Sequence, residues 1–280
     1  MPELPPAVVE RRNRAARSGV RTSLLSVPSA AGIEAVGLEP VGEVMGCAVR
    51  SAPRRHPMPY SGRRWEVMRQ HGKYYDAYSR PYLDGMRTGY NSVLARIRRE
   101  AKTLGADGIV GVQLTRTALD GGNEFVAMGT AVRARSKVRP TSLFTTELAG
   151  SDVAKLMLAG WAPMRLQWAA AAHAIDTHYN TLIIGTRNSL RASNFELDAH
   201  TKLINDVRAD ARQEFDRMTE AAHADGGIVS DLTLSTWEPG EGVTAAIAVV
   251  CGTAVARFRR TDSAPADTLT VMPLWRRGEC

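Results

Sequence analysis

The stretch GTAVRAR at residues 129–135 returns as GTAVARF at residues 252–258. Two further pairs of segments match in the same order, at a spacing of about 120 residues. EAKTLGADGIVGVQLT (100–115) matches EAAHADGGIVSDLTL (220–234), and RTSLLSVPSAAGIEAVGLEPVGEVMGCAV (21–49) matches PTSLFTTELAGSDVAKLMLAGWAPMRLQWA (140–169). Because chance does not keep several segments in order, the sequence predicts an internal duplication in which each copy is a small domain.

This duplication divides the chain into five parts. They are a basic N-terminal tail over 1–20, a first copy over 21–136, a linker over 137–140, a second copy over 141–260 and a disordered tail over 261–280. The first copy also contains a basic and aromatic loop over 50–82, whose counterpart in the second copy is neither basic nor aromatic.

Each copy repeats one pattern of expected elements. A short TSL strand leads to a short helix, which in the second copy has Ser151 as its N-cap and Gly160 just past its end. A strand follows at 41–49 or 161–169, and then a long amphipathic helix whose apolar residues are spaced by threes and fours. Two further strands close each copy. The fold class is therefore α+β, with two repeated small domains that each have an antiparallel sheet flanked by a long helix and a short helix.

The closing strands also carry expectations about packing. Strict alternation places Val110, Val112 and Leu114 on one face of the strand at 109–115. On the GTAV strand, small residues share one face, which lets a helix or another backbone approach closely. In the second copy this strand is apolar on both faces, so its second face needs cover from a neighbouring domain. GTAV is thus a packing motif.

Composition narrows the class of protein. The net charge is +7 and the pI is near 9.6, which allows an acidic partner. The three cysteines are far apart and form no CxxC pair, so neither a disulfide framework nor a zinc knuckle is indicated. No apolar run is long enough to span a bilayer. We expect a cytoplasmic protein with unpaired thiols and no membrane partner.

Several of the quoted segments resemble the YbjQ-like family, which carries a heavy-metal-binding label. The resemblance extends over 21–260 and matches a bacterial, actinobacterial tandem type. Its carrying segments are EPVGEVMG (39–46), EAKTLGADGIVGVQLT (100–115), EFVAMGTAVRAR (124–135), AGWAPMRLQWA (159–169), LSTWEPGEG (234–242) and VVCGTAV (249–255). The resemblance implies a small α+β domain of dodecin-like topology and five-fold rings in single-domain relatives. It implies no catalytic residues.

One short cluster could hold a metal ion. HAIDTH brings His173, Asp176 and His178 together, but the first copy has no such cluster and the spacing is not that of HExxH. A solvated loop entrance or a contact within a ring is the alternative, and it is the one we favour. No cofactor is expected, although a metal ion is possible.

The loop over 50–82 could bind an anion or a nucleic acid, because basic residues interleaved with aromatic ones hold phosphates and stack bases. Its candidate residues are Arg54, Arg55, Arg63, Arg64, Trp65, Tyr74 and Tyr78. The alternative, which we favour, is that tyrosines at helical spacing pack against a neighbouring subunit.

The sequence contains no GxSxG, no P-loop and no GxGxxG after a strand, so we expect no enzyme. The favoured function is an oligomeric scaffold or binding protein; the alternatives are a metal-responsive protein and, third, a nucleic-acid or anion binder. A ring of two-domain chains contains an even number of domains. Stacked five-fold rings are slightly preferred over a ring in which the copies alternate.

Overall fold

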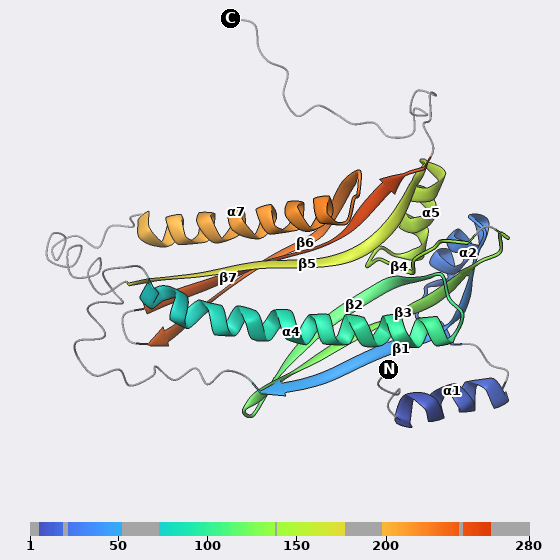
Figure 1. Cartoon of the computed structure of the whole chain (residues 1–280), viewed down its shortest axis with the longest axis horizontal. Coiled ribbons are helices and arrows are strands. Elements are labelled where there is room, and N and C mark those ends of the chain that lie inside the picture. Colours follow the sequence, from blue (N-terminus) through green and yellow to red (C-terminus); the bar gives the residue numbers. More distant parts are fainter. Residues whose placement is uncertain are drawn as a thin grey trace, which may run out of the picture.

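The computed structural model of the chain describes residues 6–18, 22–51, 73–137, 139–176, 198–240 and 243–258. Its elements, drawn in Figure 1, are α1 (Pro6–Ser18), α2 (Val27–Ala35), β1 (Leu38–Ser51), α4 (Lys73–Thr103), β2 (Gly108–Leu119), β3 (Gly122–Ala134), β4 (Phe144–Thr145), α5 (Gly150–Leu158), β5 (Trp161–Asp176), α7 (Asp198–Ala221), β6 (Gly226–Gly240) and β7 (Val243–Arg257).

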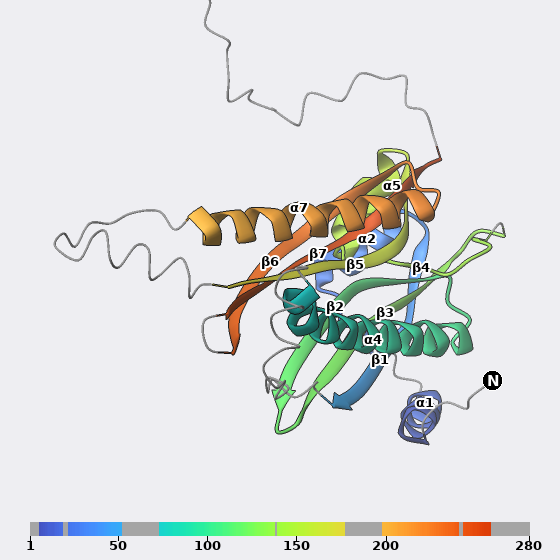
Figure 2. The ribbon, with the colours of Figure 1, turned by 60° about the vertical axis from the view of Figure 1, so that its left-hand side comes forward.

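The elements form two sheets and two long helices in alternating layers. The first sheet has the strand order β1-β3-β2-β4 and the second has β5-β7-β6. Both views show α7 on the outer face of the second sheet and α4 between the two sheets (Figures 1 and 2). The predicted mixed α+β class is confirmed. No helix in the described part of the chain is long and apolar enough to cross a membrane.

The two halves share detailed features of their sheets. The short helices end before Gly37 and Gly160, which both have positive φ. The pairing of the first and last strands shifts register at Pro40/Gly42 and at Pro163/Arg165, again 123 residues apart. The pairing of the middle strands shifts at Val110/Gln113 and at Val229/Asp231. The counterpart of a residue in the first copy is therefore found by adding 123 to its number. Within α4 and β2 the number to add is 118 instead.

The GTAV motif packs as predicted. In the first copy, Ala127 and Ala131 are buried in a cluster with Val93 and Ile97 of α4. In the second copy, a Cβ added to Gly252 would lie 2.9 Å from the ring of Phe215 on α7. A side chain at this glycine would therefore push the helix away from the sheet.

The prediction that Val110 and Val112 share a face is wrong. Val110 belongs to the cluster beneath α2 and α5, whereas Val112 belongs to the cluster beneath α4. The cause is the register shift between Val110 and Gln113, where Gly111 has a φ of +61°. A bulge adds one residue and so reverses the alternation after it.

Several expected boundaries also differ. Residues 73–82 of the expected loop form the first turns of α4, and β5 continues past 169 to Asp176 because its pairing with β7 is uninterrupted to that point. Ser151 does not cap α5; its N-cap is Ala149, which makes no side-chain hydrogen bond. Within the expected N-terminal tail, α1 is a helix that begins at Pro6, a residue favoured at the first helical position.

Candidate functional site: the joint between the two copies

Helix α4 contacts both sheets, so it joins the two halves of the molecule. Val93 and Ile97 are fully buried against the first sheet. Leu83 is buried with Ala170 and Ile247 of the second sheet, and the ring of Tyr90 lies 4.7 Å from that of Trp168. The second face of the second sheet is thus covered by α4 of the same chain, in agreement with the expectation that a neighbouring domain covers it.

The first sheet is completed by a strand from the second copy. Strand β4 pairs with β2 in parallel, so that Phe144 lies opposite Gly108. The amide of Thr146 donates to the carbonyl of Ile109 (3.0 Å), and the amide of Gly111 donates to the carbonyl of Leu148 (3.0 Å). The second copy therefore contributes main-chain hydrogen bonds to the core of the first.

A glycine makes room for this strand. A Cβ built on Gly108 would lie 2.1 Å from the Phe144 ring. Gly226 is the counterpart of Gly108 on β6, and the nearest heavy atom to its built Cβ is 3.8 Å away. The space that Phe144 fills at the first sheet is open at the second.

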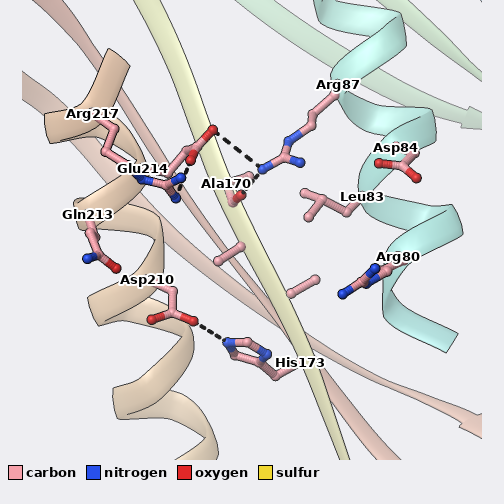
Figure 3. A pocket seen from close by; sticks show the side chains of 12 residues that line it. Arg80, Leu83, Asp84, Arg87, Ala170, His173, Asp210, Gln213, Glu214 and Arg217 are labelled. Carbon is pink, nitrogen blue, oxygen red and sulfur yellow. Dashed lines mark hydrogen bonds and ion pairs between the residues drawn. The ribbon is translucent and has the colours of Figure 1, made fainter. Parts of the chain in front are cut away.

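A cleft of about 420 Å³ lies where α4, β5 and α7 meet (Figure 3). Helix α4 contributes two arginines, an aspartate and a leucine; β5 contributes residues 170–173; α7 contributes two carboxylates, a glutamine and an arginine. The lining residues are Arg80, Leu83, Asp84, Arg87, Ala170, Ala171, Ala172, His173, Asp210, Gln213, Glu214 and Arg217.

Five of the ionisable side chains in this cleft form ion pairs or hydrogen bonds with one another: Arg87, Arg217, Glu214, His173 and Asp210. Arg87 donates to the carbonyl of Ala170 at the free edge of β5 (3.0 Å) and lies 3.7 Å from Glu214 (Figure 3). Glu214 also pairs with Arg217 of its own helix (2.5 Å). His173 Nε2 lies 2.8 Å from a carboxylate oxygen of Asp210. Arg87 thus ties α4 to both β5 and α7.

Among the described residues, the lining of this cleft includes no serine, threonine, cysteine or lysine that could act as a nucleophile beside the His173–Asp210 pair. Three arginines are balanced by three carboxylates, which favours neither an anion nor a cation. The arrangement is that of a polar contact between two packed domains.

Burial shifts the pKa values of Arg98 and Cys251, which lie near the contact between the two copies. Arg98 of α4 lies close to Thr145 Oγ1 (3.4 Å), and burial together with the charge of Arg165 lowers its pKa to about 10. Cys251 of β7 is packed among the residues of the first core, and burial raises its pKa to about 12, with a further contribution from Glu147. That carboxylate accepts hydrogen bonds from the Ser230 and Thr253 hydroxyls.

The predicted metal cluster is only partly described. His173 lies on β5, three residues before the strand ends, and contacts Asp210, a residue that the sequence did not single out. Asp176 ends the same strand, and His178 lies outside the described residues. No group of three or more His, Cys, Asp or Glu side chains in the described part of the chain could hold a metal ion.

Most residues of the predicted basic and aromatic site lie outside the described residues. Arg54, Arg55, Arg63, Arg64 and Trp65 belong to the undescribed segment 52–72. Tyr74 and Tyr78 lie in the first turns of α4.

Sequence reasoning missed Arg87 and Glu214, which join the copies, and Asp210, which contacts His173 within the second copy. The only signal was that one face of α4 is apolar where its counterpart on α7 is polar. Cys47 and Cys251 are free thiols, as predicted, and Cys280 lies outside the described residues.

Comparison with known proteins agrees with the expected family. Residues 73–135, which comprise α4, β2 and β3, match the family model described as "Putative heavy-metal-binding". This part of the chain is similar to a YbjQ-like domain. An encapsulin nanocompartment protein of Mycobacterium tuberculosis is 36% identical over 169 residues, which are 58% of this chain. The matched region spans 58% of that relative's length. No solved structure matches the chain.

Proposed function

We propose that this chain is a non-enzymatic, cytoplasmic scaffold protein that assembles with copies of itself. The observation that carries the proposal is the crossing of β4, by which one domain completes the sheet of the next. Strand addition of this kind supplies main-chain hydrogen bonds at a sheet edge, and it can be repeated from domain to domain. The apolar second face of α4 supports the same proposal, because Leu83 on this face packs against Ala170 and Ile247 of the second sheet.

Native mass spectrometry of the untagged protein tests the proposal directly. At tens of micromolar we expect a defined multiple of the 30.4 kDa chain mass and no bound ion. A chain that remains monomeric over the whole micromolar range would show that self-assembly is not its function. Because the same spectrum reports bound metal, a stoichiometric ion would instead favour the metal-responsive alternative.

The relative gives a second candidate function: association with an encapsulin nanocompartment. The 36% identity to a protein of that name is its only support. Co-expression with an encapsulin shell protein, followed by isolation of intact shells, tests it. We expect the chain to be retained with the shells through size-exclusion chromatography and to be absent from shells expressed alone; a chain found only in the unbound fraction would refute the association.

A further inference from the structure

Strand β5 is an edge strand whose outer side faces the cleft. In the described part of the chain the second sheet has the order β5-β7-β6, so β5 pairs with β7 alone. In an antiparallel pair, successive residues direct their main-chain groups alternately to the partner strand and to the free edge. The carbonyl of Ala170 accepts from Arg87 of α4, and the amide of Leu166 donates to a threonine hydroxyl of β4, so both residues face the edge. The main-chain groups of Ala172 and Ala174 therefore also point outward.

This part of the edge is open to another strand. No described residue forms a hydrogen bond with the outward main-chain groups of Ala172 and Ala174. Unpaired edges are templates for strand addition unless a bulge, a charged side chain or a covering element blocks them. The pairing with β7 has no bulge here, and residues 169–172 are all alanines, which leave the main chain accessible. Among the described residues, nothing blocks the edge of β5 beyond Ala170.

The two long helices turn this edge into a groove. Helix α4 covers one face of the second sheet and α7 covers the other, and Figure 3 looks onto the edge between them. Both helices extend past the strand, because Arg87 of α4 approaches Glu214 of α7 (3.7 Å) across the edge at Ala170. This contact closes one end of the groove, and the cleft of about 420 Å³ continues along β5 to His173. A strand in the groove would be covered on both of its faces.

The walls of the groove favour particular side chains. Directly opposite residues of neighbouring strands point to the same face of a sheet. A residue opposite Ala172 would therefore point towards α4, where Leu83 packs against that alanine. A residue opposite His173 would point towards α7, where the side chain of Asp210 lies 2.8 Å from the imidazole and is 52% exposed. The first position suits an apolar side chain, and the second suits a basic one.

From this geometry we propose that the edge of β5 binds an extended peptide segment of a partner protein by strand addition. The segment runs antiparallel to β5, which is the more stable pairing, and its residues opposite Ala172 and Ala174 each exchange two main-chain hydrogen bonds with the strand. An apolar side chain of the segment packs against Leu83, and the basic side chain next to it pairs with Asp210. This inference goes beyond the proposed scaffold function and does not depend on self-assembly.

A designed peptide tests the main-chain pairing. The probe is fluorescein-labelled Thr-Val-Lys-Val-Thr with an amidated end, in which the valines lie opposite Ala172 and Ala174 and the lysine lies opposite His173. Binding to the full-length protein is followed by fluorescence anisotropy. We expect N-methylation of both valines to raise the dissociation constant at least tenfold, because it removes the two donors that face β5.

The same peptide supplies a matched control. N-methylation of the lysine and of the last threonine adds the same two methyl groups at amides that point away from β5, so we expect it to leave the dissociation constant within about twofold. Equal weakening by the two patterns of methylation would overturn strand addition. A probe that does not bind at millimolar concentration would overturn it as well.

Charge reversal on α7 tests the position of the basic side chain. We expect Asp210→Lys to raise the dissociation constant of the lysine peptide at least tenfold, and a peptide with glutamate in place of the lysine should bind this variant more tightly than it binds the wild type. Asp206→Lys is the matched control, because Asp206 pairs with Lys202 and lies outside the cleft lining. Equal effects of the two substitutions would contradict the proposed place of the lysine.

Hydrogen exchange, resolved by residue, identifies what occupies the edge. In free protein at submicromolar concentration the amides of Ala172 and Ala174 should exchange fast, and saturating peptide should slow them at least tenfold. The amides of Ala171 and His173, which face β7, should not change. Slow exchange without peptide would show that another segment of the chain covers the edge, and protection that grows with protein concentration would show that a second copy does. Either result would overturn the peptide partner, and the second would leave self-assembly intact.

Discussion

At the scale of single residues, the second core contains a buried polar pair that the first core lacks. The hydroxyl of Thr219 lies 2.9 Å from Oε1 of Gln167, while Nε2 of Gln167 has no hydrogen-bond partner among the described residues and Gln167 is fully buried. Exchanging the two amide positions would leave the oxygen without a partner instead. The counterparts in the first copy are Val44 and Ala101, which are both fully buried.

We expect the double variant Gln167→Val with Thr219→Ala to raise the free energy of unfolding by about 1 kcal/mol, because it removes an unsatisfied buried amide together with its partner. Thr219→Ala alone should lower it by about 1–2 kcal/mol, since the whole amide then lacks a partner. Urea unfolding followed by circular dichroism measures both. A double variant less stable than the single one would contradict the account.

Cys251 gives a prediction about pH. Burial raises the pKa of this thiol to about 12, so the folded chain keeps it protonated where an unfolded chain loses the proton. The contribution of the neutral buried thiol to stability is therefore complete below about pH 9 and is lost as the pH rises towards 12. We expect iodoacetamide to label Cys251 at least tenfold more slowly in folded protein than in urea at pH 8, measured by peptide mass spectrometry. Equal rates would mean that the thiol is not buried.

At the scale of elements, the docking of β4 depends on the fit between Gly108 and Phe144. We expect Gly108→Ala to lower the free energy of unfolding by about 1–3 kcal/mol, because the new methyl group would overlap the phenylalanine ring. In a Phe144→Ala background, Gly108→Ala should lower the free energy of unfolding much less, because the phenylalanine ring is absent. A double-mutant cycle in urea measures this coupling. Additive effects would show that the two residues do not compete for space.

The sequence was sufficient to predict most elements of the sheets. It was also sufficient to predict why the GTAV motif consists of small residues. Periodicity of apolar residues located the long helices, and the repeated motif located the last strand of each copy. It could not predict that Val110 and Val112 face opposite sides, because the bulge between them depends on pairing with β3. It also could not predict that β4 joins the first sheet, since two paired residues leave no periodic pattern.

At the scale of the whole molecule, the shared helix should make unfolding cooperative. Because α4 packs against both sheets and β4 crosses between the copies, neither copy has a complete core alone. We expect one calorimetric transition at submicromolar concentration, with equal calorimetric and van't Hoff enthalpies. Leu83→Asp, which places a charge between α4 and the second sheet, should separate this transition into two. Two transitions in the wild type would show that the copies are independent.

The candidate site belongs to this scale, and this is why the sequence did not reveal it. Arg87 lies on α4, whereas Asp210 and Glu214 lie on α7, far along the chain, and Arg87 becomes their neighbour only when α4 and α7 flank the edge of β5. His173 was noticed because of nearby residues in the sequence, yet its contact is with Asp210 on another element. Local spacing identifies sites on one element and misses sites made by packing.

The short link between β3, which ends at Ala134, and β4, which begins at Phe144, has a thermodynamic consequence. It holds the two partners of the internal joint at an effective concentration on the order of millimolar, so that this joint persists at any dilution. Only a contact between separate chains responds to the amount of protein in solution. In the proposed assembly, contacts between separate chains alone would therefore control the size, and the building block would already be a pair of domains.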